Sequence, residues 1–424
     1  MSLNRKAMVL AVGAALAAPG AHAQITSQSG VGWEFYGKFY PEIVRIHGDS
    51  PSPVGTTLST LSSANITSGA TAGNSNIVNR AEMQVGNTYV GFRGGKSLGG
   101  GMKGIWQMEA TITLDEGGGT LAGRDTFLGV EAGWGTLRLG LMDTPFKKAG
   151  DVLGFLGVSS GNFVATNSVL RQVGFSSAAA GPNRASRFHE RRGNAIDFAS
   201  PTFFGGLQYQ MQYSIGNPSE TAITSNPPRS PRFVSQALKY ETGPWYFAIM
   251  NEVHFDMFGG SSNATAAQSN AADGSVTSKD MSNHAAVVFK LGVHSFEVDY
   301  NMKTYKETPE SSLANATGKF QEYKNTAYLL AMENRWSSQW RTSFHYNHAN
   351  AGDCKLFNAA CSTTGLDGTQ ISAGVAYYLD PAMYVFGLYS VLKNGDSARY
   401  TNGSQAPGVG EDVTQYAIGL ALNL

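Results

Sequence analysis

The stretch that decides the fold is Leu207-Gln208-Tyr209-Gln210-Met211-Gln212-Tyr213, in which a large apolar or aromatic side chain alternates with a glutamine. Successive side chains of a β-strand point to opposite faces, so this segment has one oily face and one wet face. A helix would scatter both kinds of side chain around its surface. The pattern therefore predicts a strand that touches an apolar medium and water at the same time.

The same alternation recurs along the chain. A soluble β-sandwich also alternates, so the number of strands and their connections must decide between the two architectures. The chain contains sixteen candidate strands. An even number of strands lets a single-chain barrel close its edges, and a barrel of sixteen strands is wide enough for a water-filled lumen. The candidate strands are 31–47, 86–94, 102–114, 125–132, 135–143, 191–200, 206–215, 235–242, 244–254, 282–291, 293–305, 323–334, 338–348, 368–379, 382–392 and 412–424.

The connections between these segments alternate in length. Gly133-Trp134, Thr242-Gly243 and Asp380-Pro381 are tight turns, whereas 48–85, 144–190, 255–281 and 306–322 are long and polar. Short turns on one rim and long loops on the other are typical of transmembrane β-barrels, and few compact soluble domains contain so many long connections. We predict an all-β fold, a 16-stranded antiparallel transmembrane barrel.

The first residues predict export. Arg5 and Lys6 precede an apolar run over residues 7–18, and Ala21-His22-Ala23 follows it. This is the pattern of a cleavable signal peptide, because the run is shorter than the roughly 20 residues that a spanning helix needs. We expect a signal peptide over 1–23 and a mature domain over 24–424 that begins at Gln24.

Charge and cysteine content narrow the function further. The chain carries 31 basic and 31 acidic residues, so it has no electrostatic footprint for nucleic acid. Cys354 and Cys361 fit an oxidising compartment, where so short a spacing allows a disulfide that closes a small loop. Two unrelated thiols are the alternative.

An ordered set of motifs along the mature chain resembles the trimeric general porins of Gram-negative bacteria. No single piece of the set is decisive, but the order is specific. The pieces are Tyr36-Gly37, Tyr89 to Gly94 followed by Leu98 to Lys103, Phe127 to Val130 with Gly135-Thr136-Leu137, Asn194 to Ile196 through Ser200-Pro201 and Phe203, and Tyr378 to Pro381.

The resemblance implies an outer-membrane channel for passive diffusion of small hydrophilic solutes, with no catalytic residues, cofactor or metal. It implies a homotrimer in contact with outer-membrane lipid and lipopolysaccharide. The third long loop, 144–190, would fold inward and narrow the pore, with basic wall residues facing it. The last strand, 412–424, ends on apolar Leu424 where the family has Phe, and it would engage the barrel assembly machinery.

The resemblance carries over to individual constriction residues. Arg124 and Arg191 match basic wall positions of the family, whereas Tyr89 stands where another arginine is expected; Arg93, on the same face of the strand, is the expected substitute. A loop with this excess of positive charge predicts a weak preference for anions. Between Thr144 and His189 the loop carries Lys147, Lys148, Arg171, Arg184 and Arg187 against Asp151 alone.

Five more charged residues are pore-lining candidates, because they alternate with the apolar positions of their strands and so point to the inner face of the wall. The alternative for each is a hydrated wall residue far from the constriction, since alternation fixes the face of the strand but not the position along the pore axis. These residues are Lys38, Lys103, Glu109, Arg138 and Asp197.

Two motifs imitate enzyme signatures. Gly157 to Gly161 spells G-x-S-x-G, but it lies in a glycine-rich loop without the strand and helix of a nucleophile elbow. Gly99, Gly101 and Gly104 spell G-x-G-x-x-G, but strand sequence follows, so we predict a hairpin turn. The alternatives to a general diffusion channel are a substrate-specific channel for a carboxylate or sugar and, less favoured, a barrel enzyme.

Overall fold

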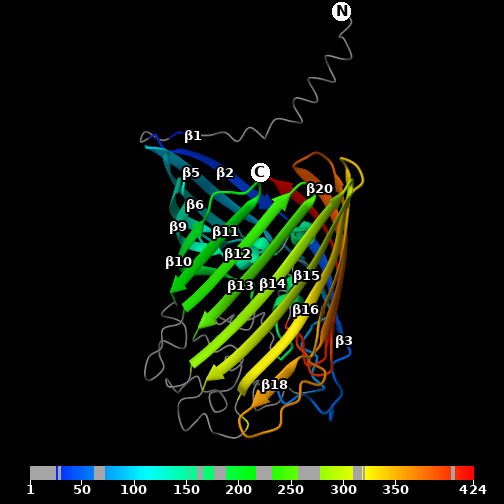
Figure 1. Ribbon diagram of the computed structural model, residues 1–424. Coiled ribbons are helices and arrows are strands. Elements are labelled where there is room, and N and C mark those ends of the chain that lie inside the picture. The colour runs from blue at the N-terminus through cyan, green and yellow to red at the C-terminus, as the bar shows by residue number, and fades with distance from the viewer. Residues whose placement is uncertain are drawn as a thin grey trace, which may run out of the picture.

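The computed structural model describes residues 25–26, 30–61, 72–150, 152–159, 166–175, 188–215, 232–255, 277–308, 318, 320–402 and 406–424. These residues form one antiparallel sheet that closes on itself (Figure 1). The sheet has 21 strands, of which β2 with β3 and β4 with β5 each form one interrupted wall strand. Short β1 (Ile25–Thr26), β7 (Gly119–Thr120) and β18 (Asp353–Leu356) are accessory, which leaves the predicted sixteen wall strands in the described part of the chain.

The wall follows chain order, each strand pairing with the next. Its strands are β2 (Gly32–Phe39) with β3 (Glu42–Asp49), β4 (Arg80–Gln84) with β5 (Tyr89–Gly99), β6 (Met102–Ile112), β8 (Thr126–Ala132), β9 (Gly135–Asp143), β10 (Arg191–Ala199), β11 (Leu207–Ile215), β12 (Arg232–Thr242), β13 (Trp245–Phe255), β14 (Thr277–Leu291), β15 (His294–Thr308), β16 (Phe320–Arg335), β17 (Trp340–Ala349), β19 (Gly368–Tyr378), β20 (Met383–Asn394) and β21 (Asp412–Asn423).

The last strand closes the barrel. One edge of β21 pairs with β20, and its other edge pairs with β3 and the end of β2, as in the register Ala417↔Val44. Both edges of β21 are therefore paired, as a barrel in lipid requires, because unpaired backbone groups are costly there. The predicted fold class is confirmed.

Several predicted boundaries need correction. The strand predicted at 31–47 is interrupted at Tyr40-Pro41, where proline has no N–H to donate to the sheet. The second wall strand begins with β4, inside the loop predicted at 48–85. Strands β14 and β15 extend beyond their predicted external ends, because polar side chains occupy both faces there, and β16 begins three residues earlier than predicted, at Phe320.

The two faces of the wall differ as the alternation predicts. Outward-pointing Leu128 and Ile418 are each 69% exposed, whereas inward-pointing Asp197 is fully buried. The apolar exterior is the surface that lipid would cover. In the described residues, no helix is long and apolar enough to cross a membrane.

The short turns gather at one rim of the barrel, the upper rim in Figure 1, where the C-terminal end also lies. Gly243 at the β12–β13 turn has φ of 54°, a conformation that favours glycine. Gly100 and Gly101, with φ of 61° and 76°, join β5 to β6, so the G-x-G-x-x-G sequence is the predicted hairpin turn.

The described residues of the loop over 144–190, which we call the inward loop, pack against the inner wall of the barrel. Its described parts include α2 (Pro145–Ala149), the 3₁₀ turn η1 (Phe155–Val158) and α4 (Thr166–Arg171). Seven phenylalanine and leucine side chains of the loop are buried among the side chains of the inner wall, and burial of each contributes about 1.5–3 kcal/mol. They are Phe146, Leu153, Phe155, Leu156, Leu170, Phe175 and Phe188.

Wall carboxylates hold the inward loop at three successive points. Leu153 N–H donates to Glu297 at 2.8 Å, and Phe155 N–H donates to Glu333 at 2.6 Å. The Ser159 hydroxyl donates to Glu42. The loop is therefore fixed across the lumen by its backbone as well as by its apolar side chains.

Candidate functional site

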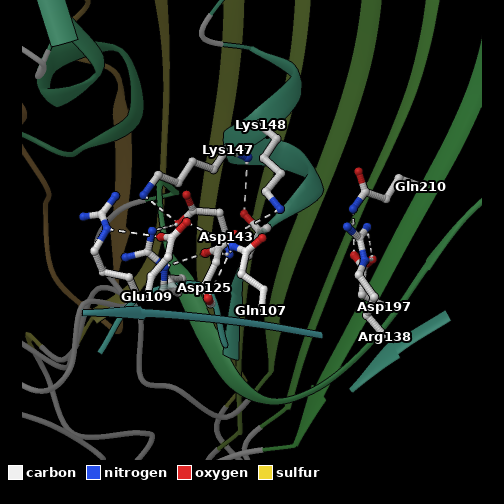
Figure 2. Close-up of polar contacts among 12 residues, drawn as sticks. Gln107, Glu109, Asp125, Arg138, Asp143, Lys147, Lys148, Asp197 and Gln210 are labelled. Atoms are coloured by element: carbon white, nitrogen blue, oxygen red, sulfur yellow. Dashed lines mark hydrogen bonds and ion pairs between the residues drawn. The ribbon is translucent and has the colours of Figure 1, made fainter. Parts of the chain in front are cut away.

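A charged cluster lies where α2 meets the ends of β9 and β10, and we refer to it as the constriction, the role that the sequence predicts for it. Thr144 caps α2 by accepting a hydrogen bond from Lys147 N at 3.3 Å, and Pro145 occupies the first turn. With the helix begun at this point, the Lys147 side chain reaches back to Asp143, with 2.9 Å between Nζ and Oδ1. Lys148 reaches Asp125 at 3.3 Å (Figure 2).

Arg191 joins the two carboxylates of this cluster. It lies directly opposite Asp143 in the β9–β10 register, and its Nη2 is 3.0 Å from Asp143 Oδ1. Its Nε is 2.7 Å from Asp125 Oδ1, which also accepts the N–H of Asp143 at 2.9 Å. Three cations thus share two carboxylates, and the cluster carries a net positive charge.

Glu109 on β6 anchors the neighbouring part of the wall. It accepts hydrogen bonds from the Tyr36 hydroxyl at 2.9 Å and from Gln107 at 3.0 Å. Arg124 Nε lies 3.4 Å from its other oxygen, and the Arg124 guanidinium lies over the Tyr89 ring at 4.6 Å. The Tyr89 ring therefore stabilises the Arg124 guanidinium by a cation–π contact.

A second polar group lies farther along the wall and is separate from the first in Figure 2. Arg138 Nε donates to Asp197 Oδ1 at 2.9 Å, and Gln210 donates to the other oxygen at 2.8 Å. The paired carboxylate is fully buried and its charge is matched by Arg138. This group stabilises the β9–β10–β11 wall and contributes little net charge to the lumen.

A cavity of about 570 Å³ lies beside the constriction, between the inward loop and the rim with short turns. Its lining contains five cationic side chains and one carboxylate, that of Asp143. Hydroxyl and ring groups of tyrosines complete much of the remaining wall. The five cations are Lys38, Arg124, Lys147, Arg335 and Arg341.

The sequence matches the model of a known family. The family described as Gram-negative porin matches residues 8–397, which is most of the chain. The chain belongs to the Gram-negative porin family. Members of this family are channels of the outer membrane and not enzymes, so the porin is an outer-membrane protein.

Curated relatives agree with this assignment over shorter stretches. The major outer membrane protein P.IB of Neisseria gonorrhoeae is 29% identical over 132 residues, 31% of this chain and 34% of the relative. The protein P.IA of Neisseria meningitidis is 36% identical over 67 residues, 16% of this chain and 17% of the relative. The porin thus matches about a third or less of the length of these relatives.

Solved structures share the fold. An anion-selective porin from Comamonas acidovorans superposes with a TM-score of 0.63 at 16% identity, over 93% of this chain and all of that one. At such low identity the likeness concerns the barrel architecture alone.

The porin structure places the sequence-predicted residues in three groups. Arg124, Arg191, Lys147 and Lys148 meet at the constriction together with Glu109 and Tyr89. Lys38 lines the cavity below them, and Arg138 with Asp197 forms the separate wall pair. Asp151, Arg184 and Arg187 lie outside the described residues.

Two predicted residues lie away from the constriction. Arg93 contacts Glu34 and covers the Tyr36 ring at 4.7 Å, so its guanidinium is held toward the rim with short turns. Lys103 faces Glu131 in the β6–β8 register near the same rim. Arg93 therefore does not take the place of the arginine that the family pattern expects at Tyr89.

Sequence reasoning missed Asp125, Asp143, Gln107, Arg335 and Arg341. The charge count over residues 144–189 began one residue after Asp143 and ignored Asp125, which starts the preceding strand region. As a result, the loop lysines looked unmatched although carboxylates contact both. The useful signals were two acidic residues at strand ends: Asp143, the last residue of β9, and Asp125, which directly precedes β8.

The remaining motifs are structural. Cys354 and Cys361 form a disulfide with Cα atoms 5.8 Å apart. Ser159 of the G-x-S-x-G sequence donates to Glu42 and ends a 3₁₀ turn, which gives it no strand-to-helix elbow. In the described part of the porin, no cluster of three or more His, Cys, Asp or Glu side chains could hold a metal ion.

Proposed function

We propose that the protein is a passive diffusion channel for small hydrophilic solutes with a preference for anions. The observation that carries the proposal is the charge of the cavity lining, in which five cationic side chains face one carboxylate. That carboxylate, Asp143, is already paired with Lys147 and Arg191. An excess of fixed positive charge in a narrow, partly desolvated passage raises the local concentration of anions.

Selectivity in this proposal has two components. The inward loop sets the width, because its apolar side is packed on the wall and wall carboxylates hold its backbone. The cationic side chains without a paired carboxylate set the sign of the ions that the channel prefers. Among the described residues, no carboxylate lies within ion-pair distance of Lys38 or Arg335, so their charges act on solutes in the lumen.

Reversal potentials in planar bilayers test the proposal. In a KCl gradient we expect large, nearly ohmic conductance steps. We expect the reversal potential to lie closer to the equilibrium potential of chloride than to that of potassium. A potassium-selective channel, or no conductance from correctly folded protein, would refute it. The Comamonas acidovorans porin is described as anion-selective, but the likeness supports only a common barrel.

A substrate-specific channel for a carboxylate or sugar is the second candidate function. Tyrosine rings border the cavity next to its cations, and Tyr378 and Tyr384 lie 4.6 Å apart between ring centroids. Small conductance steps blocked by micromolar solute would favour this candidate over general diffusion.

We also propose that the channel is a homotrimer. Strand β8 has seven residues, which at about 3.3 Å per residue and a tilt of about 40° span only about 18 Å. This is less than the apolar band of about 25 Å, whereas the 16-residue β16 exceeds it. Neighbouring copies packed against the short wall would shield it from lipid, and triplet conductance steps would report the trimer.

The outer wall supports two further partner proposals. A row of outward cations near the rim with long loops suits the phosphates of lipopolysaccharide: Arg232, Lys279 and Lys306, which follow one another across β12 to β15, with Lys324 and Lys355 beyond. The apolar outer face of β21, with Tyr416 and Ile418, suits recognition by the barrel assembly machinery. The proposed signal peptide, 1–23, lies outside the described residues.

A further inference from the structure

The cavity beside the constriction has the composition of a binding site. We call it the vestibule and define it by Lys38, Tyr40, Arg335, Arg341 and Tyr384, with the constriction at its inner end. Its volume of about 570 Å³ falls within the range of about 300–1,000 Å³ that is typical of sites for small organic molecules. A chloride ion would fill only a small part of it.

Two arginines form one end of the vestibule. Arg335 and Arg341 lie directly opposite each other in the β16–β17 register and therefore point to the same face. Like charges opposite each other on neighbouring strands repel. Glu333 pairs with Arg341 at 2.5 Å, but its other oxygen is occupied by Phe155 N–H.

This pair retains unused capacity to donate hydrogen bonds. Arg341 Nε is buried and has no acceptor among the described residues. Arg335 has no carboxylate within ion-pair distance in the described part of the chain. An anionic ligand between the two guanidinium groups would relieve the repulsion and satisfy the open donors.

A second cationic end lies across the vestibule on a different part of the wall. Lys38 comes from β2 and faces the same cavity as Arg124, whose guanidinium is held over Tyr89 and beside Glu109. Cationic side chains thus line the vestibule on two sides. Lys38 of β2 and Arg124, just before β8, lie on one side, and the arginines of β16 and β17 lie on the other. A ligand with one negative charge can meet only one of these ends.

The wall between the two ends is aromatic. Tyr378 and Tyr384 lie against each other, and the Tyr40 hydroxyl donates to Asn423 Oδ1 at 2.9 Å. Phe155 of the inward loop lies under Arg341 at 4.9 Å. Such a wall favours a ligand with a short carbon skeleton over a fully hydrated inorganic ion.

The polar groups also discriminate between an organic anion and a sugar. Recognition of sugar hydroxyls uses acceptors as well as donors, yet the single carboxylate of the lining, Asp143, is occupied by Lys147 and Arg191. Guanidinium and ammonium groups can only donate. The charged groups of the lining therefore suit a ligand whose polar atoms accept.

From these observations we infer that the vestibule is a binding site for small organic dicarboxylates, whose two carboxylates engage Lys38 at one end and the Arg335–Arg341 pair at the other. The inference rests on the proposed anion-preferring channel and names the class of solute that binds in its vestibule. Bound dicarboxylate would slow chloride flow while it occupies the vestibule.

The test is solute block of single-channel current in the full-length protein reconstituted in planar bilayers with KCl. Glutarate is the probe, with butyrate as the monocarboxylate, glucose as the neutral solute and inorganic phosphate as the purely inorganic anion. We expect glutarate to halve the current at a concentration about tenfold below that of butyrate or phosphate, and glucose to have no comparable effect.

Matched variants locate the site. Lys38→Gln and Arg335→Gln should each raise the half-blocking concentration of glutarate about tenfold. Lys239→Gln is the control, because Lys239 faces the lumen from β12 in register with Gln208 but does not line the vestibule. It should leave the block unchanged.

The outcomes separate this inference from the proposed function. Equal block by glutarate, butyrate and phosphate, or a glutarate block that neither vestibule variant weakens, would overturn the dicarboxylate site while the chloride preference stands. Potassium selectivity of the unmodified channel would overturn the proposed function itself, whatever the block. Heat-modifiable migration of each variant confirms that its barrel has folded.

Discussion

The backbone N–H of Phe155 donates to a carboxylate oxygen of Glu333 at 2.6 Å. The other oxygen of the same carboxylate contacts Arg341, so one wall residue holds both the inward loop and a cation that lines the vestibule. The width of the pore and its charge are therefore coupled through Glu333.

Replacement of Glu333 by alanine should loosen the inward loop. The Phe155 N–H would lose its acceptor, and a buried donor left unmade costs about 1–3 kcal/mol. We expect noisier single-channel current and a stronger preference for chloride, since Arg341 would also lose its partner. Glu333→Gln keeps a carbonyl acceptor and should restore the quiet current. Indistinguishable current noise in E333A and the unmodified channel would show that the hydrogen bond does not hold the loop.

The two lysines of α2 should control ion selectivity. In the double variant Lys147→Glu/Lys148→Glu, four negative groups would face one another around Asp125 and Asp143. We expect a roughly tenfold fall in the ratio of chloride to potassium permeability, measured from the reversal potential. Lys324→Glu/Lys355→Glu makes the same change in charge on the outer wall, around Glu322, and serves as the control. An unchanged reversal potential would remove both lysines from the conduction path.

Removal of a carboxylate at the constriction should act in the opposite direction. Asp125 contacts Arg191 at 2.7 Å and Lys148 at 3.3 Å, so Asp125→Asn would release two cations at once. We expect the reversal potential in a KCl gradient to move farther toward chloride. The outer-wall variant Glu322→Gln removes a negative charge that also contacts two lysines and should leave selectivity as it was. A shift of Asp125→Asn toward potassium would contradict the proposed role of the cluster.

The disulfide should stabilise the external loops without affecting conduction. A bond between residues seven apart closes a short loop, which corresponds to about 2.5 kcal/mol in the chain-entropy model. Ser362, next to Cys361, exchanges hydrogen bonds with Thr60 of the first long loop at 2.7 and 3.1 Å. Cys354→Ser/Cys361→Ser should therefore speed hydrogen exchange in both segments and leave the open-channel conductance unchanged. Equal exchange rates would exclude this role.

The predictability of the fold from sequence follows the contrast between the two faces of each strand. The segment 207–213 was located correctly because lipid and water demand opposite side chains at every step. The external ends of β14 and β15 were missed because both faces there are wet, as Lys279 and Lys306 show. Beyond the apolar band, alternation of hydrophobicity no longer marks a strand.

The constriction was predictable only in part. Arg124 and Arg191 were found by resemblance and the loop lysines by counting charge within one segment. Asp125 and Asp143 were missed because their influence depends on how the start of β8 and the end of β9 meet α2. Charge neutralisation between segments is a property of the closed barrel and cannot be read from a single loop.

The most direct test of the departure from the family pattern is Tyr89→Arg. Tyr89 lies opposite Lys38 in the β2–β5 register, and its ring carries the Arg124 guanidinium at 4.6 Å. An arginine here would replace that support by repulsion between three cations. We expect a stronger chloride preference in the reversal potential together with a less stable barrel, measured as a lower temperature of heat-modified migration. Tyr89→Phe keeps the ring under Arg124 and should leave both measurements near those of the unmodified channel. If Tyr89→Arg changes stability but not selectivity, position 89 lies off the conduction path.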